Sequence, residues 1–495
     1  MTGTPVRPVR ALARAQIEAR SIDYVPLRER HGRVRDQAPF WFLGNFHFLT
    51  IAIGFIGPAM HLSLGWTALA AVAGVLLGTG FQAFHASQGA ELGLSQMIQS
   101  RAQFGYRGVV VPLAAALFTF IGFNVVDTLI AAAGIQQIWG VTLPVTTFAL
   151  AAVATVLAVW GHDFVHAMFK AMFWISLPIW TLLTAAIVAG YAPIQATLVA
   201  DSGGFSWVAF ATQFAAAASY NITYAPYVSD YSRYLPPTTS RVAIIGNVFA
   251  GSALSAAWLI VLGAWLAART GSGDALVAIL QVGNRLGPGL GLALCVTSVG
   301  ALVAAMGMNA YSASLTFLTG WDSFTDRHPG PMLRLIVIAG IVTTWVAIAL
   351  ASGSGAINAL GATLVLMLYL LCPWTSVNLV DYFVLRKGRY AIVDLARADG
   401  IYGAWGMRGL VSYGAGLAAS VPFFVIPGVW TGPVAAWMGG VDLAWLVGLA
   451  VAAGSYLWAN RKFARTDEDA AIARSQAELA LIDAAPLHQL ADTVV

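Results

Sequence analysis

Long apolar stretches separated by short polar segments repeat along most of this chain. A helix that crosses a membrane needs ~17–25 predominantly apolar residues, and runs of this kind recur from the first stretch to the last. We expect twelve membrane-spanning helices, at residues 39–61, 66–86, 110–138, 142–160, 167–190, 205–231, 241–268, 287–318, 333–351, 356–384, 409–429 and 440–459. The pattern predicts an all-α polytopic membrane protein, with one integral domain at 37–461 between polar tails at 1–36 and 462–495.

The sixth apolar stretch differs from the others because it contains polar residues, a proline and several tyrosines. Four tyrosines recur at helical spacing and would share one face of a continuous helix, namely Tyr220, Tyr224, Tyr227 and Tyr231. Pro226 removes a backbone donor and clashes with the preceding turn, which predicts a kink or break. In hydrocarbon, a broken backbone is tolerated only where protein or a water-filled cavity covers it. The segment therefore indicates the wall of a polar site inside the membrane.

The first apolar stretch has an interruption that matches the one in the sixth. Gly54 and Gly57-Pro58 lie about two-thirds of the way along it, and Pro226 lies at about the same fraction of the sixth stretch. Because successive spans alternate in direction, the two stretches run in opposite senses. Paired interruptions in oppositely oriented halves are typical of inverted-repeat transporters, whose site lies between the halves. A chance pairing of prolines is the alternative.

Glycine is frequent in the chain, and the second stretch contains GVLLG at 74–78. This small-xxx-small spacing lets two membrane helices approach closely. Glycine-rich spans also produce the spacing by chance, so it indicates a candidate helix contact and nothing about function.

Composition and charge agree with a membrane protein. Hydrophobic residues make up 59% of the chain and charged residues 10%, against ~25% charged in soluble domains. With a cytoplasmic N-terminus, the N-terminal tail and the even-numbered loops hold 24 of the 26 Lys and Arg residues, and only Arg269 and Arg285 lie elsewhere. The positive-inside rule then predicts that both termini are cytoplasmic, in a plasma (inner) membrane. The basic residues are divided among loops, whereas a nucleic-acid-binding surface would gather them on one face.

Several function classes are disfavoured by motifs that the sequence lacks. Cys295 and Cys372 both lie in apolar runs, so no disulfide or metal framework follows. A membrane enzyme is the main rival class, but no HExxH motif, serine–histidine pair or paired carboxylates lie in the spans. There is no Walker A loop and no TVGYG-type filter. We expect a transporter without cofactor or obligate protein partner, whose partners are a small-molecule substrate and the lipid bilayer.

Five motifs follow one another between about residues 36 and 405. They are LGLSQMIQSRAQFGYRG (92–108), IGFNVVDT (121–128), YAPYVSDYSRYLP (224–236), MNAYSASL (308–315) and PWTSVNLVDYFVLRKGRYAIVDL (373–395). Together they resemble the nucleobase–cation symporters, and specifically their purine–cytosine permease branch. The resemblance implies a LeuT-like fold with ten helices in two inverted repeats and two further helices. It also implies import of a nucleobase or a related small heterocycle, driven by a cation gradient.

The resemblance implies substrate contacts in the third span. Phe123 and Asp127 lie four residues apart, hence on one helix face. The family has a tryptophan and an amide at these positions, which stack on the heterocycle and bind its edge. Phe123 keeps an aromatic face, but Asp127 is a departure, and a carboxylate deep in a span is a functional hypothesis by default. It could accept hydrogen bonds from an amino-heterocycle, balance a cationic ligand or carry the coupled proton. A structural pair with a buried partner is the alternative.

Further contacts are expected from the sixth, eighth and first spans. Tyr224 stands where the family has a second stacking aromatic residue, while core packing accounts better for the tyrosine stripe as a whole. Asn309 matches a family asparagine that binds the substrate edge, since an amide both donates and accepts; a helix–helix hydrogen bond is its alternative. Asn45, His47 and Thr50 precede the predicted break in the first span. One of these three is expected to face the site, and we include Asn45 and Thr50 among the candidates.

Gating is expected from the sixth span as well. Pro226 would act as a hinge. Asp230 lies three residues before Arg233, so a structural or gating ion pair is more plausible for it than a substrate contact.

The coupling ion follows from a comparison with sodium-coupled relatives, which use hydroxyls five and six residues before the asparagine. Here those positions are Ala304 and Val303, with Gly300 one turn earlier. A hard cation needs oxygen ligands, and these side chains supply none. We therefore expect proton coupling through Asp127 and no metal site. A sodium-coupled or uncoupled carrier of another heterocycle (allantoin, hydantoin or a vitamin-like ring) is the alternative.

Overall fold

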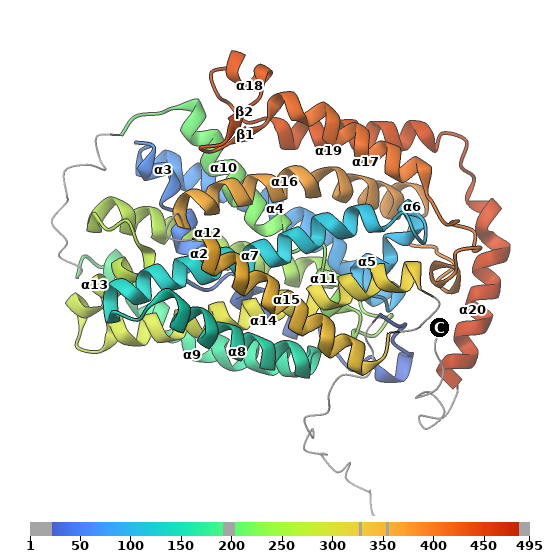
Figure 1. The fold of residues 1–495 in the computed structure, drawn as a ribbon, viewed down its shortest axis with the longest axis horizontal. Coiled ribbons are helices and arrows are strands. Elements are labelled where there is room, and N and C mark those ends of the chain that lie inside the picture. Colours follow the sequence, from blue (N-terminus) through green and yellow to red (C-terminus); the bar gives the residue numbers. More distant parts are fainter. Residues whose placement is uncertain (1–21, 192–202, 326–328, 353–355, 485–495) are drawn as a thin grey trace, which may run out of the picture.

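The computed structural model describes residues 22–191, 203–325, 329–352 and 356–484. Within these ranges the chain is almost entirely helical, and most helices run along the longest axis of the molecule (Figure 1). Parts of the two predicted tails, 1–21 and 485–495, lie outside the described residues.

Most of the predicted spans are long single helices. Their bounds are α4 Leu64–Leu92, α7 Val110–Trp139, α8 Leu143–Trp160, α9 His162–Val188, α12 Arg241–Thr270, α14 Leu290–Phe324, α15 Pro331–Ser352 and α16 Ala356–Leu379. A π-helical segment, Val380–Leu385, continues α16. Among the described residues, eight helices are long and apolar enough to cross a membrane, and one bent pair raises this number to nine.

The remaining predicted spans are shorter or interrupted helices. The sixth is α10 (Trp207–Ile222) followed by α11 (Val228–Ser232), and the last two are α17 (Met407–Ser420) and α19 (Ala444–Ala459). The all-α polytopic fold is therefore confirmed, while the count of twelve spans stays a prediction.

The first span is broken at two places, and one of them lies at a predicted position. It consists of α1 (Gln37–Gly44), α2 (Phe48–Ile53) and α3 (Ile56–Ala59). The bend of 58° separates Val34–Gly44 from Phe48–Ala59, so the main break lies at 45–47. A second interruption, between α2 and α3 at 54–55, coincides with the predicted Gly54, whereas Gly57-Pro58 lies within α3. A Cβ at Gly54 would overlap the carbonyl oxygen of Ile260 in α12. Gly54 therefore ends α2 and also permits close packing against α12.

The predicted break in the sixth span is confirmed. α10 ends at Ile222 and α11 begins at Val228, with Pro226 in the connecting segment 223–227. The two broken spans touch each other, because the Tyr224 hydroxyl donates a hydrogen bond of 2.7 Å to the Gly44 carbonyl at the end of α1.

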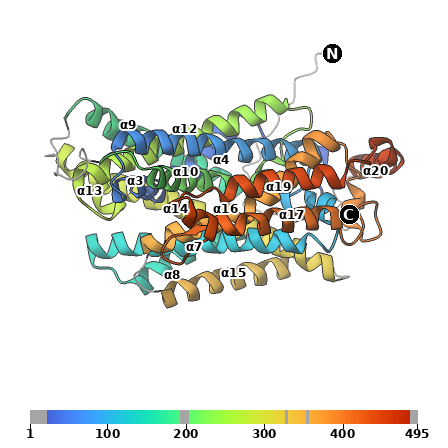
Figure 2. The ribbon, with the colours of Figure 1, turned by 90° about the horizontal axis from the view of Figure 1, so that it is seen from above.

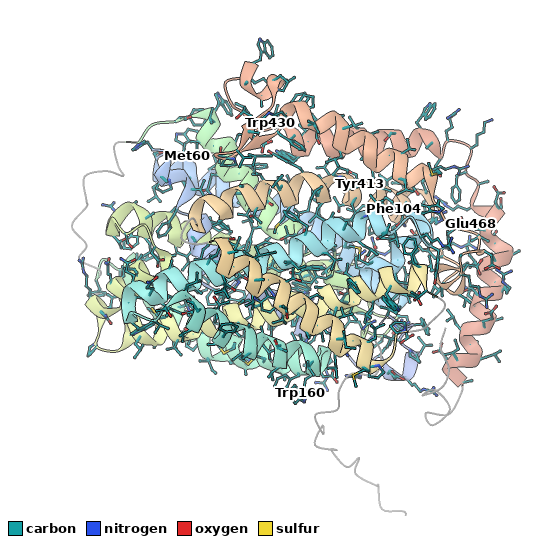
Figure 3. The ribbon with its side chains drawn as sticks, viewed as in Figure 1. Met60, Phe104, Trp160, Tyr413, Trp430 and Glu468 are labelled. Carbon is teal, nitrogen blue, oxygen red and sulfur yellow. The ribbon has the colours of Figure 1, made fainter. Side chains whose placement is uncertain are left out.

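The helices pack as three groups. In the first, α4 packs on α10 and α12, and α12 also packs on α1 and α2; in the second, α14 packs on α7, α8, α9 and α15. Figure 2 shows α4 and α12 on one side of the molecule and α8 and α15 on the other. The third group joins α17 and α19 to α16. Figure 3 shows Tyr413 of α17 beside Phe104, edge to face with ring centroids 6.2 Å apart.

The predicted glycine contact in the second span holds in the structure. A Cβ at Gly74 would overlap the Phe214 carbonyl oxygen, and a Cβ at Gly78 would overlap that of Ala218. Both oxygens belong to α10, so the GVLLG motif is where α4 and α10 approach most tightly through their backbones.

Short elements lie between and beyond the spans. The helices are α5 Gln96–Gln99, α6 Arg101–Phe104, α13 Ala275–Leu286, α18 Pro433–Trp437 and α20 Asp469–Ala484, and the hairpin pairs β1 Val425–Ile426 with β2 Trp430–Thr431. The 3-10 turns are η1 Leu27–Glu29, η2 Val34–Asp36, η4 Val393–Ala396, η5 Val421–Phe423 and η6 Arg465–Glu468. Figure 3 shows Glu468 at the end of the molecule that carries α20, far from Met60 and Trp430.

Many outward-facing side chains of the spans are large and apolar. Trp174, Leu182, Leu254 and Val296 are each more than half exposed. Exposure of large apolar side chains on several long helices is what a lipid-facing surface requires, and it agrees with an integral membrane protein.

Candidate functional site

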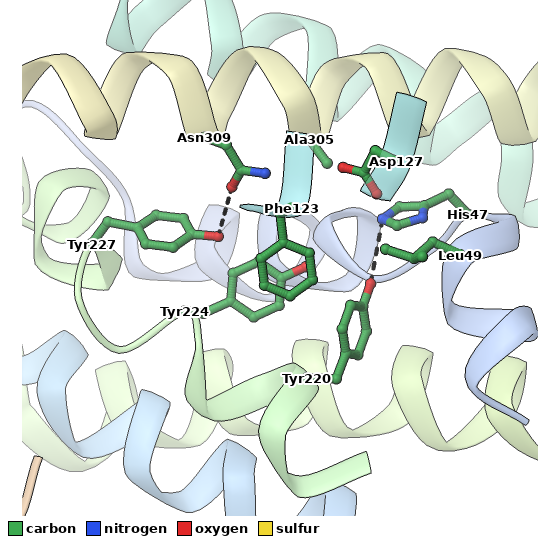
Figure 4. A pocket seen from close by; sticks show the side chains of 9 residues that line it. All are labelled: His47, Leu49, Phe123, Asp127, Tyr220, Tyr224, Tyr227, Ala305 and Asn309. Atoms are coloured by element: carbon green, nitrogen blue, oxygen red, sulfur yellow. Dashed lines mark hydrogen bonds between the residues drawn. The ribbon is translucent and has the colours of Figure 1, made fainter. Parts of the chain in front are cut away.

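Residues at the two helix breaks form one wall of a pocket, which Figure 4 shows. Its lining consists of His47, Leu49, Phe123, Asp127, Tyr220, Tyr224, Tyr227, Ala305 and Asn309. All nine are buried, and the non-atom space among them, including any that opens to solvent, is about 230 Å³. The pocket is thus narrow, and its walls are buried side chains.

The structure brings together the four predicted contacts that came from sequence motifs. Phe123 and Asp127 of α7, Tyr224 of the break in the sixth span and Asn309 of α14 all line the pocket. Figure 4 shows Asp127 at one end of the pocket and Asn309 nearer the other. Their roles as substrate contacts stay a prediction.

The first span contributes a different residue from the two that we included. His47 and Leu49 line the pocket, whereas Asn45 and Thr50 are not among its lining residues. Asn45 donates from Nδ2 to the Ser252 carbonyl at 3.0 Å. The backbone carbonyl of Asn45 accepts a hydrogen bond from the Thr50 hydroxyl at 2.5 Å. These two side chains therefore satisfy backbone groups that the break exposes, as a broken membrane helix requires.

The carbonyl of Gly44 ends α1 and receives two side-chain donors from the pocket wall. Tyr224 donates from its hydroxyl at 2.7 Å, and His47 Nε2 lies 3.1 Å away. The Tyr220 hydroxyl lies 2.7 Å from Thr50 Oγ1 and 3.3 Å from His47 Nε2. The break and the pocket are thus one hydrogen-bonded structure.

At the opposite end, Asn309 is held by its neighbours. Its Oδ1 accepts from the Tyr227 hydroxyl at 3.1 Å, and its Nδ2 donates to Asn124 Oδ1 at 3.1 Å. Asn124 in turn donates to the Met306 carbonyl at 3.2 Å. Asn124 is a buried neighbour that the sequence analysis did not single out, and it fixes how Asn309 is oriented.

The tyrosine stripe divides between pocket and core. Tyr220 and Tyr227 line the pocket together with Tyr224, with ring centroids 5.9 Å and 5.6 Å from that of Tyr224. Tyr231 instead packs 4.8 Å from the ring of Phe40. The spacing of the four tyrosines was the signal for Tyr220 and Tyr227, but core packing was the preferred explanation for them.

Asp127 is the one carboxyl group in the pocket lining. Its side chain is 2% exposed. Among the described residues, its Oδ1 has no hydrogen-bond partner and no salt bridge involves it. A structural pair with a buried partner, the alternative considered for Asp127, is absent from this part of the chain. A group of this kind inside a span points to a bound ligand or proton.

The chain was then compared with known proteins. A family model described as a permease for cytosine/purines, uracil, thiamine and allantoin matches residues 24–448. The chain belongs to this permease family.

Individual relatives agree with this assignment. YxlA of Bacillus subtilis, assigned as a purine-cytosine permease, is 33% identical over 443 residues, which cover 88% of this chain and 94% of YxlA. The purine-cytosine permease fcyB of Emericella nidulans is 24% identical over 472 residues, covering 90% and 89% of the two chains.

Solved structures agree at the level of fold. Mhp1, a nucleobase-cation-symport-1 family transporter in a closed conformation with bromovinylhydantoin bound, has a TM-score of 0.72 at 18% identity and covers 92% of this chain and 98% of its own. An inward-facing conformation of Mhp1 gives 0.67 at 20% identity, covering 93% and 99%. The fold of this permease is therefore LeuT-like, and the protein is a membrane transporter rather than an enzyme.

The predicted gating residues of the permease lie outside the pocket lining. Asp230 is buried and accepts a hydrogen bond of 3.0 Å from the backbone N–H of Gln96. Arg233 is buried and donates to the Tyr311 hydroxyl at 3.2 Å. These contacts join the end of the sixth span to α5 and α14, which is compatible with an anchor or a gate.

Proposed function

We propose that this permease imports a nucleobase or a closely related small heterocycle across the plasma membrane, in symport with protons and by alternating access. The observation that carries the proposal is the pocket of buried side chains at the two helix breaks, lined by aromatic rings and by the lone carboxyl group of Asp127. Ligand sites of this kind combine apolar walls with a few placed polar groups that fix orientation.

The aromatic lining supports a flat ring as ligand. Phe123 comes from α7 and Tyr224 from the break in the sixth span, and their rings offer faces for stacking. The names of the relatives, purine-cytosine permeases, support the same ligand class.

The choice of a proton as coupling ion rests on residues of α7 and α14. Asp127 is a buried carboxyl group in the pocket, a type of group that serves proton relays in transporters. Val303 and Ala304 are buried side chains without oxygen where sodium-coupled relatives have hydroxyls. A hard cation would find no side-chain ligand at these two positions.

The packing of the helices supports alternating access. Both broken spans belong to the group around α4 and α12, while α7 and α14 belong to another group that carries Asp127 and Asn309. Rocking of one group against the other around a fixed site is the usual motion of transporters built this way. In this scheme the segment 223–227 around Pro226 absorbs the change in backbone angles.

Uptake into liposomes tests the proposal. Purified permease is reconstituted, the external medium is made acid relative to the lumen, and uptake of labelled cytosine, adenine and uracil is followed with and without sodium. We expect at least one base to accumulate above its external concentration, independently of sodium, and to lose this accumulation with a protonophore. Sodium dependence would replace the proton in the proposal, and equilibration without accumulation would indicate an uncoupled carrier. Uptake of none of these bases would contradict the proposed substrate class.

A further inference from the structure

The two ring nitrogens of His47, a lining residue of the pocket, have different surroundings. Nε2 lies 3.1 Å from the Gly44 carbonyl, which can only accept a hydrogen bond. Nε2 therefore carries the ring hydrogen of the neutral imidazole. Nδ1 is then a bare acceptor, and it is buried without a hydrogen-bond partner among the described residues. His47 thus has one free position for a proton.

The hydroxyl groups beside His47 fix the same form of the ring. Thr50 donates its hydrogen to the Asn45 carbonyl at 2.5 Å, so Thr50 Oγ1 accepts from the Tyr220 hydroxyl, 2.7 Å away. The Tyr220 oxygen lies 3.3 Å from His47 Nε2 and has only lone pairs left to offer the ring. Two acceptors therefore hold the hydrogen on Nε2 and leave Nδ1 free.

The groups around His47 can stabilise a positive charge on the ring. The Gly44 carbonyl ends α1, and carbonyl groups at a helix C-terminus carry partial negative charge. Asp127 of α7 lines the same pocket, and Figure 4 shows its carboxyl group at the same end as the His47 ring. None of the nine lining residues is a lysine or an arginine, so the lining contains no permanent cation that would repel a proton.

The remaining titratable groups near the break are phenols or lie at helix ends. Tyr220 and Tyr224 bond to His47 or to the same carbonyl, and Tyr227 bonds to Asn309. A phenol ionises at a pH of ~10, so it stays neutral when a carboxyl or an imidazole exchanges a proton. The charged residues of the helices that pack on α2, namely α12, α13 and α14, lie at or beside the ends of those helices; they are Arg241, Arg269, Asp274, Arg285 and Asp322.

A second buried histidine, His85 of α4, has no free nitrogen. Its Nδ1 accepts from Gln96 Nε2 at 3.2 Å, and its Nε2 lies 2.6 Å from the Thr375 hydroxyl. A proton added to Nδ1 would face the hydrogens of the Gln96 amide, so the His85 ring is held neutral. The two buried rings therefore differ in the one property that proton binding needs.

We propose that His47 binds the coupled proton at Nδ1, with the Asp127 carboxylate as its counter-charge; this inference rests on the proton symport proposed above. The proton comes from the outer medium, adds to the Nδ1 lone pair and is given up to the inner medium, so no bond of the ring is broken. The cationic ring keeps its hydrogen on Nε2 and binds the Gly44 carbonyl by a stronger, charge-assisted hydrogen bond. Because Tyr224 binds the same carbonyl, the proton acts where the two broken spans meet.

Proton movement during uptake tests this role of His47. The permease is reconstituted in liposomes that enclose a pH-sensitive dye, and labelled cytosine, adenine or uracil is added outside, whichever the uptake assay above shows to be transported. Wild-type permease should carry protons inward with the base and acidify the lumen. His47→Gln keeps an amide that can donate to Gly44 but cannot bind a proton, so base should enter down its gradient while the luminal pH stays constant.

His85→Gln is the matched control, because it makes the same substitution at a buried histidine outside the pocket lining. Its ratio of protons to base should equal that of the wild type. The melting temperatures of both variants show whether each one folds.

The affinity for the base gives a second measurement, which does not need transport. If one proton binds together with the base, wild-type affinity should fall by up to about 10-fold for each unit of rising pH over the range in which the proton is lost. His47→Gln should remove this slope, and His85→Gln should keep it. Thermal shift of the purified proteins over a series of pH values measures the dissociation constants.

The outcomes separate this inference from the proposed function. A wild-type ratio of protons to base in His47→Gln, or an unchanged pH slope of its affinity, would overturn the role of His47 and leave proton symport intact. Base uptake by the wild type without acidification of the lumen would overturn proton coupling itself, and this inference with it. If His47→Gln fails to fold, nitrogen NMR of wild-type permease with labelled histidine decides instead. One ring should become an imidazolium when base is added at constant pH, and the absence of such a change would overturn the inference.

Discussion

The four tyrosines of the sixth span share a helical spacing but have different environments. Tyr220 lines the pocket and bridges Thr50 and His47. Tyr231 lies one turn past Tyr227, donates to the Met308 carbonyl at 3.3 Å and packs among other rings. The break between α10 and α11 separates them: Tyr224 and Tyr227 of the connecting segment still line the pocket, whereas Tyr231 in α11 does not.

Removing one hydroxyl at each position tests this division. Tyr220→Phe deletes a hydrogen bond of the pocket wall, so affinity for the transported base should fall by about 2- to 10-fold, the equivalent of ~0.5–1.5 kcal/mol. Tyr231→Phe is the same chemical change outside the lining and should leave affinity unaltered. The dissociation constants of the purified variants, measured by thermal shift, provide the comparison. A larger loss for Tyr231→Phe would place the binding site elsewhere.

Asp127 has two candidate roles that substitutions can separate. Asp127→Ala should abolish concentrative uptake while the protein still reaches the membrane, because the variant removes both a ligand acceptor and a proton carrier. Asp127→Asn keeps the shape of the side chain but cannot cycle a proton. Retained binding with lost accumulation by Asp127→Asn would identify a proton carrier, whereas lost binding would identify a ligand partner. Wild-type uptake by Asp127→Ala would remove Asp127 from the site.

The sequence located the pocket residues only where a motif or a helical spacing constrained them. Phe123 and Asp127 share a face of one unbroken helix, and both line the pocket. For the first span, the choice among polar residues depended on where the helix bends, and the main bend at 45–47 lies about two turns before the predicted interruption at Gly54. His47 was therefore not preferred over Asn45, although all three polar residues at the break were noted.

In the sequence, a glycine or a proline in a span does not by itself say whether the helix breaks there. Both weaken a helix, but glycine also permits two backbones to touch. Pro226 does lie in a break, whereas a Cβ at Gly57 would collide with the side chain of Thr67 in α4. Without knowing the neighbouring helix, the sequence cannot separate a hinge from a contact. At the main bend of the first span, the side chains of Asn45 and Thr50 donate hydrogen bonds to backbone carbonyls.

The contact between α4 and α10 can be tested at two glycines that lie two residues apart. Gly78→Ala places a methyl group against the Ala218 carbonyl of α10 and should lower the melting temperature of the purified permease, since overpacking costs ~1–3 kcal/mol. Gly80→Ala is the control, because nothing lies within 4 Å of its added Cβ. This control should be neutral or slightly stabilising, as alanine favours a helix by ~1 kcal/mol over glycine. Equal melting temperatures for the two variants would contradict the close approach.

Beyond the spans, α20 ties together segments that are far apart in the sequence. Figure 1 shows α20 along one end of the molecule. Asp483 near its end accepts from the Leu27 backbone N–H at 2.8 Å and from the Tyr24 hydroxyl at 3.3 Å. Ser475 accepts from the Val393 N–H at 3.0 Å. The predicted polar tail is thus, over its described residues, a docked helix that links the segment before α1 to the one after α16.

The docking of α20 should depend more on the ion pair between Arg474 and Asp394 than on the pair between Arg397 and Glu478. Arg474 donates to both oxygens of Asp394 at 2.9 Å, and Asp394 is 1% exposed. Removing one partner of a fully buried pair costs ~3–5 kcal/mol, but Arg474 is itself about half exposed, so ~1–2 kcal/mol is the expected loss for Arg474→Ala. This loss would raise the population of the undocked helix about 5- to 30-fold.

Limited proteolysis of the purified permease measures that population, because a detached α20 is cut faster than a docked one. Arg474→Ala should accelerate cleavage within 469–484 by about the same 5- to 30-fold. Arg397→Ala is the matched control, since Arg397 and Glu478 are both substantially exposed and lie 3.4 Å apart, a pair worth ~0–1 kcal/mol. If both variants are cut at the wild-type rate, the apolar contacts of Ile472 and Leu479 hold the helix without help from Asp394.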